Sequence, residues 1–213
     1  MAQAEGVTAT AAKGNSQISK FTNYVQAMQE KVREKNPNAM IIPFLSNHDM
    51  DRIAGTFVTE NQMRMAANMY LLCSGSPVIY YGEEIGMRGS RGSVSTDANR
   101  RLAMLWGDGD TVKNPVGTTY SAANQISTTA ADQMKDENSL YRYYCRLLTI
   151  RHTYPAIARG EYTAVDCGQK NLGGFLIGYE GQTLLLLHNN STGEISYDLS
   201  QHSDLAGSSF SQV

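Results

Sequence analysis

Residues 40–49 read MIIPFLSNHD, and this stretch decides the fold that we expect the chain to adopt. The apolar run 39–45 predicts a strand that is buried on both faces, as in a parallel sheet. Asn47, His48 and Asp49 then follow at the point where such a strand ends. In parallel α/β folds, the carboxyl ends of strands bind ligands and carry out chemistry. The stretch therefore predicts a polar site at the mouth of a parallel sheet, although Pro43 removes one donor from the expected ladder.

The residues around this stretch alternate between helical and extended patterns. Apolar spacings of three and four residues predict helices over 18–35, 59–74 and 138–153. A second buried strand is expected at 78–81, after the break Gly75-Ser76-Pro77. A strand, a helix and a second strand in succession require a crossover, so the two strands should pair in parallel.

The remaining segments differ from this pattern. Residues 1–16 are small and polar and are expected to form a loop or tail. Residues 86–135 form a long loop rich in glycine, serine and threonine, and loops of that length are usually functional. Beyond Pro155 the period shortens, and short strands are expected over 160–165, 174–179, 183–189 and 194–199, with turns at 180–182 and 191–193. The tail should therefore be an all-β domain that starts near residue 157.

The bulk composition excludes several classes of protein. The 213 residues carry a formal net charge of −2, so no basic field favours nucleic acid or an anionic membrane. No apolar stretch is long enough to span a bilayer, and the N-terminus has no signal-peptide pattern, so the compartment stays unassigned. The three cysteines are scattered, which argues against a disulfide framework or a zinc site.

Several motifs in a fixed order give the chain a family resemblance. They are FLSNHD at 44–49, SGSPVIYYGEEIGM at 74–87, RLAMLW at 101–106, NSLY at 138–141, LTIR at 148–151, PA at 155–156 and GEY at 160–162. Together they resemble the C-terminal part of an α-amylase-type enzyme of glycoside hydrolase family 13. The resemblance implies a partial (β/α)₈ barrel over 1–156, comprising its last two strands with their helices and the loop 86–135. An antiparallel β-sandwich domain, either complete or truncated, would follow over 157–213.

The resemblance also assigns roles to the residues after the first strand. Retaining glycoside hydrolysis uses two carboxyl groups about 5–5.5 Å apart, a nucleophile and a general acid. The family signatures for both are absent from this sequence, so the chain is expected to be inactive alone. Asp49 would be the third carboxylate of the family, which stabilises the transition state by binding sugar hydroxyls. His48 and Asn47 would bind the same sugar.

Other polar and aromatic residues have weaker assignments. Arg52 is interpreted as a structural partner of a nearby carboxylate, with a substrate contact as the alternative. Trp106 is either a sugar-stacking platform or a residue buried under the long loop. Glu83 and Glu84 are adjacent and should point to opposite faces, so they are expected to position loops by hydrogen bonds rather than to act as a catalytic pair. His152 and His188 fall within element patterns and are expected to be structural.

The resemblance implies retaining hydrolysis or transfer of α-1,4-linked glucan, with an α-glucan oligosaccharide as the partner molecule. The alternative is a non-catalytic module whose β tail binds glucan or only supports the barrel. An unrelated α/β hydrolase is disfavoured because no Gly-x-Ser-x-Gly elbow occurs. No cofactor is expected in the chain itself, and calcium is a candidate for the complete enzyme. Two barrel strands without neighbours would expose sheet edges, so self-association or pairing with the missing barrel portion is expected.

Overall fold

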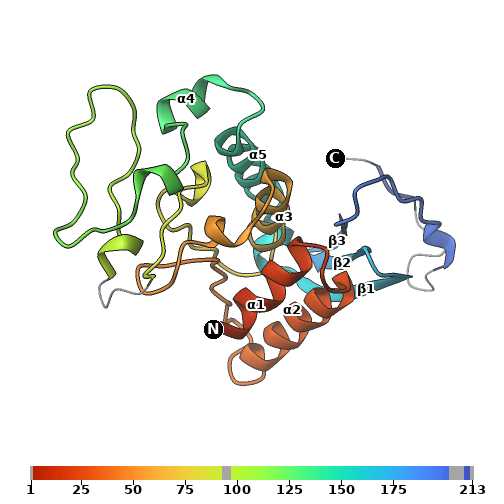
Figure 1. The fold of residues 1–213 in the computed structure, drawn as a ribbon. Helices are drawn as coiled ribbons and strands as arrows, with labels where there is room; N and C mark the ends of the chain where they lie inside the picture. The colour runs from red at the N-terminus through yellow and green to blue at the C-terminus, as the bar shows by residue number, and fades with distance from the viewer. Residues whose placement is uncertain (1, 93–96, 202–208, 212–213) are drawn as a thin grey trace.

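The computed structural model describes residues 2–92, 97–201 and 209–211. Its α-helices are α1 (Ala2–Ala12), α2 (Ile18–Arg33), α3 (Glu60–Leu71), α4 (Ala130–Lys135), α5 (Leu140–Thr153) and α6 (Pro155–Arg159). Its strands are β1 (Glu161–Gln169), β2 (Leu172–Tyr179) and β3 (Gln182–Asn189). Short 3₁₀ turns occur at η1 (Ile53–Thr56), η2 (Glu83–Ile85), η3 (Asp97–Arg100), η4 (Ala122–Asn124) and η5 (Leu199–Gln201). Figure 1 shows the helices in the middle of the molecule, the sheet on one side and the long loop on the other.

Helices α2, α3 and α5 confirm the three predicted helices. Hydroxyl caps begin two of them, because Thr59 accepts from the amide of Gln62 and Ser139 accepts from the amide of Arg142. The expected loop at the N-terminus was wrong, since residues 2–12 form α1. Alanine has the highest helix propensity, and α1 contains five of them and packs against α2 and α3. Tertiary packing thus completes a helix that has no strong amphipathic pattern.

The two predicted parallel strands lie side by side but do not form a strand ladder. The amide of Ser76 donates to the carbonyl of Ile41 at 2.9 Å, and the amide of Val78 donates to that of Pro43 at 2.9 Å. A parallel ladder at this register also needs an N–H from residue 43, which proline lacks. The prediction of regular strands was therefore wrong for these segments, although their parallel neighbourhood is present.

Gly75 allows this close approach. Its φ is +91°, and a Cβ there would overlap the carbonyl group of Ile41. A residue with a side chain would therefore meet both a strained backbone and a clash, which explains glycine at the break before the second segment.

The C-terminal strands form an antiparallel sheet in the order β1-β2-β3. The predicted turn at 180–182 is confirmed, because Glu180 and Gly181 both have positive φ, as a type I′ hairpin turn requires. The predicted fourth strand was wrong. In the described part of the tail, Ile195 and Tyr197 instead lie in an irregular segment that packs against the outer face of the sheet. A single sheet, rather than a two-sheet sandwich, is what the described residues contain.

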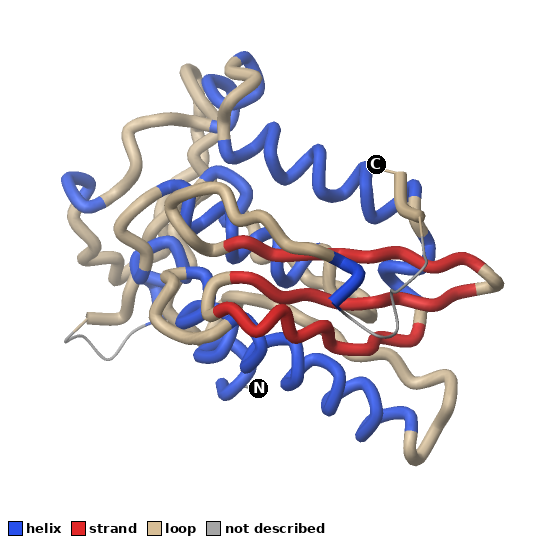
Figure 2. The backbone as a smooth tube through the Cα atoms, turned by 90° about the vertical axis from the view of Figure 1, so that its right-hand side faces the viewer, coloured by secondary structure: helices blue, strands red, loops and turns tan. Residues whose placement is uncertain are grey.

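The inner face of this sheet shares one apolar core with the helices. Tyr162, Phe175 and Ile177 from the sheet belong to the same buried cluster as Ile18 and Phe21 from α2. Figure 2 shows the three strands alongside the helices in the turned view. The core thus continues across residue 156, and the proposed division of the chain at 156/157 stays a prediction.

The long loop 86–135 forms a small core together with Ile85 of η2. Ile85, Met87, Leu102, Met104 and Ala130 form a separate buried cluster, and the segment also contains η3, η4 and α4. Among the residues that the structure describes, every helix is too short or too polar to cross a bilayer.

Candidate functional site

The loop 47–52 presents the predicted site residues at the end of the first extended segment. The side-chain oxygen of Asn47 accepts from the amide of Asp49 at 2.8 Å, which fixes a tight Asx turn. The preceding residues Leu45 and Ser46 are buried, whereas the side chains of His48 and Asp49 are 63% and 64% exposed. The turn therefore lifts these two side chains into solvent from a buried base, where a ligand can reach both.

His48 and Asp49 lie together and share a cation. His48 Nε2 lies 3.2 Å from one carboxylate oxygen of Asp49, and Arg101 Nη2 lies 3.1 Å from the other. Arg101 Nε also donates to the carbonyl of His48 at 3.2 Å. A carboxylate has about four lone-pair positions, so Asp49 can still accept hydrogen bonds from hydroxyl groups.

A second arginine ties the site loop to η3. Arg100 donates to the carbonyl of Asp49 at 2.8 Å, to the carboxylate of Asp51 at 2.7 Å and to that of Asp97 at 3.0 Å. Arg101 completes the network with a contact of 3.3 Å to Asp97. Sequence reasoning missed this network, and the adjacent pair of arginines near a catalytic-type aspartate was the signal that could have indicated it.

Asp51 stays ionised within this network. Partial burial raises the pKa of its carboxyl, but the backbone N–H of Arg91 and the guanidinium of Arg100 outweigh that effect and lower it below its usual range. The carboxylate of Asp51 is therefore a firm anchor for Arg100 at neutral pH.

Arg52 lies beneath the site rather than in it. The residue is only 2% exposed, and its guanidinium lies 4.5 Å from the ring centres of both Tyr80 and Tyr81. It donates to the carbonyls of Arg100 and Tyr81 at 3.1 and 2.6 Å. Its electrostatic partner among the carboxylates is Glu84. Burial raises the pKa of Glu84, and the positive charge of Arg52 opposes that rise. Arg52 thus holds loops together, and this burial removes it from any surface that a sugar can touch.

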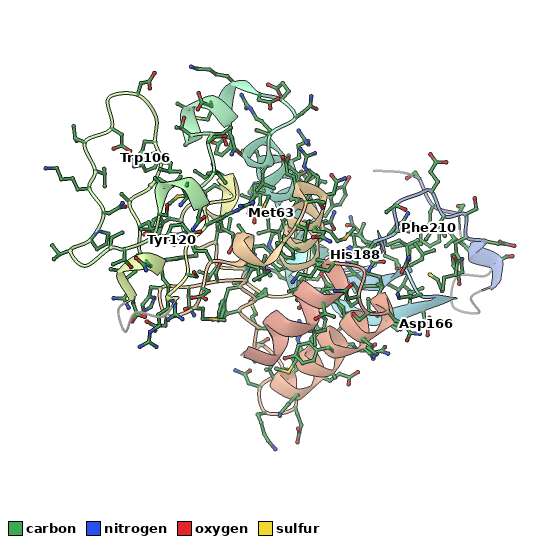
Figure 3. All side chains as sticks on the ribbon, viewed as in Figure 1. Met63, Trp106, Tyr120, Asp166, His188 and Phe210 are labelled. Carbon is green, nitrogen blue, oxygen red and sulfur yellow. The ribbon has the colours of Figure 1, made fainter. Side chains whose placement is uncertain are left out.

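Trp106 is exposed, which contradicts the expectation of burial under the loop. The residue is 53% accessible, its amide donates to Asp110 at 3.2 Å, and its carbonyl accepts from Ala131 at 3.0 Å. Figure 3 places it on the long-loop side of the molecule, well away from His188. Among the described residues, no hydrogen bond or ion pair joins Trp106 to His48 or Asp49.

Glu83 has the hydrogen-bonding role that its position predicted. Its carboxylate is buried and accepts from the hydroxyls of Ser46, Tyr70 and Tyr144. Glu84 is half-buried and makes none of these contacts, so the two acids do occupy different surroundings. The three hydroxyl partners come from distant parts of the chain, which is why the sequence pattern could not identify them.

Metal-ligating side chains are not gathered elsewhere in the described ranges. Among residues 2–92, 97–201 and 209–211, no three His, Cys, Asp or Glu side chains are arranged to hold a metal ion. The cysteines Cys73, Cys145 and Cys167 are free thiols, of which the first and last are buried.

Comparison with known proteins identifies the family. The family model described as "Alpha amylase, catalytic domain" matches residues 2–160, which include the His48-Asp49 loop, both arginines and Glu83. The chain therefore belongs to the α-amylase family, glycoside hydrolase family 13, as its motifs predicted.

Individual relatives agree with this placement. The chain is 31% identical over 183 residues to alpha-amylase SusG of Bacteroides thetaiotaomicron, covering 82% of this chain and 26% of SusG. It is 28% identical over 169 residues to alpha-amylase 3 of Dictyoglomus thermophilum, covering 78% and 33% of the two chains. The solved structure of Eubacterium rectale Amy13B superposes with a TM-score of 0.81 at 31% identity, over 92% of this chain and 39% of Amy13B. The chain thus spans about a quarter to two fifths of these relatives.

Proposed function

We propose that this chain supplies the sugar-binding carboxylate of a retaining α-glucan hydrolase, acting on starch or maltooligosaccharides. The observation that carries the proposal is the exposed pair His48 and Asp49, held 3.2 Å apart on a loop with a buried base. Hydrogen bonds from sugar hydroxyls to Asp49 would strengthen as the ring flattens towards the oxocarbenium-like transition state. Asp49 would therefore lower the barrier, although it would be neither the nucleophile nor the acid.

The neighbouring residues have supporting roles in this proposal. His48 Nε2 would face the same edge of the sugar as Asp49. The oxygen of Asn47 already accepts one backbone hydrogen bond, and its amide nitrogen would donate to a sugar hydroxyl. The exposed face of Trp106 would stack on a more distant sugar unit, at a separate point of the chain.

An open apolar groove supports the partial-barrel part of the proposal. A cavity of about 440 Å³ lies between α2 and the segment 40–44, with Phe21, Val25 and Met28 among the side chains that line it. Ile42, on this segment, is 62% exposed. An apolar surface next to an extended segment that forms no regular ladder is where further barrel strands would pack. We therefore propose that the groove pairs with the rest of an α-amylase barrel, or with a second copy when that portion is absent.

Calcium remains a proposal for the complete enzyme, and no step of the proposed chemistry depends on it. A non-catalytic glucan-binding module is the second candidate, with the β tail as the binding surface.

Affinity electrophoresis of the 213-residue chain through soluble starch tests the main proposal. We expect starch to retard the wild-type chain, Asp49→Asn to reduce the affinity about tenfold, and Asp166→Asn to have no effect. Asp166 is a matched control because it is an exposed aspartate at the far end of the sheet (Figure 3). Equal retardation of the Asp49 variant, with loss on changing Tyr197 in the tail, would favour the binding module. Release of reducing sugar by the chain alone would refute its expected inactivity.

A further inference from the structure

Glu83 joins three hydroxyl groups from three separate segments. Its Oε1 accepts from Tyr70 of α3 at 2.6 Å and from Tyr144 of α5 at 3.3 Å, and its Oε2 accepts from Ser46 at 2.7 Å. All four residues are at most 4% exposed. Because every one of these groups donates to Glu83, the arrangement suits an ionised carboxylate, which is an acceptor only.

Ser46 connects this buried carboxylate to the site. It directly precedes Asn47, the first residue of the loop 47–52, and its hydroxyl oxygen also accepts from the amide of Ile53 at 3.5 Å. Ile53 directly follows the loop. Both ends of the loop that carries His48 and Asp49 therefore meet at one hydroxyl, and Glu83 fixes the direction of that hydroxyl.

Protonation of Glu83 would change this arrangement. A protonated carboxyl gains a donor and loses acceptor capacity, so at least one of the three hydroxyls must turn away. Burial raises the pKa of Glu83 to about 7, against the opposing effect of its three hydrogen bonds. The titratable groups that face it are Tyr70 from α3, Tyr144 from α5 and Glu84 from η2, while the segment before the loop contributes only the Ser46 hydroxyl. Burial, followed by the charge of Glu83, raises the pKa values of both tyrosines well above 10, so they stay protonated donors.

We propose that Glu83 is a positioning residue for the sugar-binding pair: acting through Ser46, its carboxylate holds both ends of the loop 47–52 and so sets where His48 and Asp49 lie. The proposal rests on the proposed function for its consequence, because a loop that shifts changes the sugar contacts of Asp49. It differs from a purely structural role of Glu83, which would stabilise the fold without any communication to the loop.

Amide NMR spectra of the isotope-labelled 213-residue chain test the coupling without sugar. The chain carries His48→Gln, so that the loop contains no imidazole, and the amides of residues 47–50 are followed from pH 5.5 to 8.5. We expect their shifts to move with a midpoint at about 7, and the movement to vanish in Glu83→Gln. In Ser46→Ala, the amide of Ile85 should still report the titration while the loop no longer responds. Loop shifts that persist unchanged in either variant would overturn the proposal.

Maltotriose binding by the chain with His48 intact separates this proposal from the proposed function. The affinity should change more between pH 6 and pH 8 in the wild-type chain than in Glu83→Gln, and the difference between the two chains isolates the contribution of Glu83. Ser46→Ala should bind about fivefold more weakly at pH 8, as expected for the loss of one hydrogen bond. Should even the wild-type chain fail to bind while the amide titration behaves as described, the proposed function is refuted and the coupling stands. If the chain binds and Ser46→Ala binds equally well, the positioning role is refuted.

Discussion

The imidazole of His188 is buried in the apolar core without a hydrogen bond. The residue is 2% exposed and packs edge-on against the rings of Phe21 and Phe175, with ring centres 5.9 and 6.3 Å away. Neither of its ring nitrogens has a partner among the described residues. An unpaired polar group in this environment costs about 1–3 kcal/mol. Replacing it by leucine, which has a similar volume and no polar atom, should therefore stabilise the chain at pH 7 by about that amount.

The same burial makes His188 a source of acid sensitivity. Burial lowers its pKa from 6.5 to about 4, so the folded state excludes a proton that the unfolded chain binds. Stability linked to this group is full above pH 6.5 and falls as the pH drops towards 4. Between pH 7 and pH 5 the loss amounts to about 2 kcal/mol, which His188→Leu should abolish.

Urea unfolding at pH 7 and pH 5 measures both effects. Wild type, His188→Leu and His152→Leu are compared, and His152 is the control because it is exposed on α5. Titrations of other groups affect all three proteins alike and cancel in the differences. The reasoning is refuted if His188→Leu loses as much stability between pH 7 and pH 5 as wild type does, or if His152→Leu gives the same gain.

Three further predictions concern the buried acid, the sheet and the groove. The pKa of Glu83 is raised from 4.5 to about 7, so its contribution to the free energy of unfolding is full below pH 4.5 and is lost as the pH rises through 7. Wild type should therefore lose about 2 kcal/mol of stability from this group between pH 5.5 and 8 in urea titrations, and Glu83→Gln should not. A Cβ at Gly174 would overlap a carbonyl of β3, whereas one at Gly178 would meet open space, so Gly174→Ala should lower the melting temperature by more than about 5 °C and Gly178→Ala should barely change it. Ile42→Asp should reduce both the binding of an apolar fluorescent dye and the association of the chain measured by sedimentation. Val58→Asp, at a position outside the groove that is still more exposed, should leave both unchanged.

The sequence predicted those parts of the fold that depend on local pattern. The alternating apolar positions of residues 18–33 formed an amphipathic helix, and the Glu180-Gly181 turn formed the expected hairpin. Family motifs located the exposed His48 and Asp49 correctly at the end of an extended segment. These features were predictable because each depends on residues that are close together in the chain.

The errors arose where distant residues decide the outcome. Pro43 was recognised as unfavourable for a ladder, yet its effect on the hydrogen bonds from Ser76 and Val78 became clear only from their register. The helix α1 depends on packing against α2 and α3, which no local pattern reveals. The three hydroxyls on Glu83 come from positions 46, 70 and 144, and a single sequence gives no sign that they meet.

The two attachments of the site loop respond to different properties of the solvent. On the outer side, Arg100 and Arg101 hold Asp49, Asp51 and Asp97 through ion pairs with carboxylates that are 37% to 64% exposed. Mobile ions screen such pairs, with a Debye length of about 8 Å at physiological ionic strength. The arginines should therefore release the loop as salt is added.

On the inner side, salt cannot reach the carboxylate of Glu83, and only a proton changes its bonds. Ionic strength and acidity thus act on different contacts of one short loop. High salt would weaken the ion pairs of Arg100 and Arg101 while the hydrogen bond between Glu83 and Ser46 stays intact. Mild acid would weaken that hydrogen bond while the ion pairs stay intact. Added salt and mild acid can consequently be used to perturb the positions of His48 and Asp49 independently.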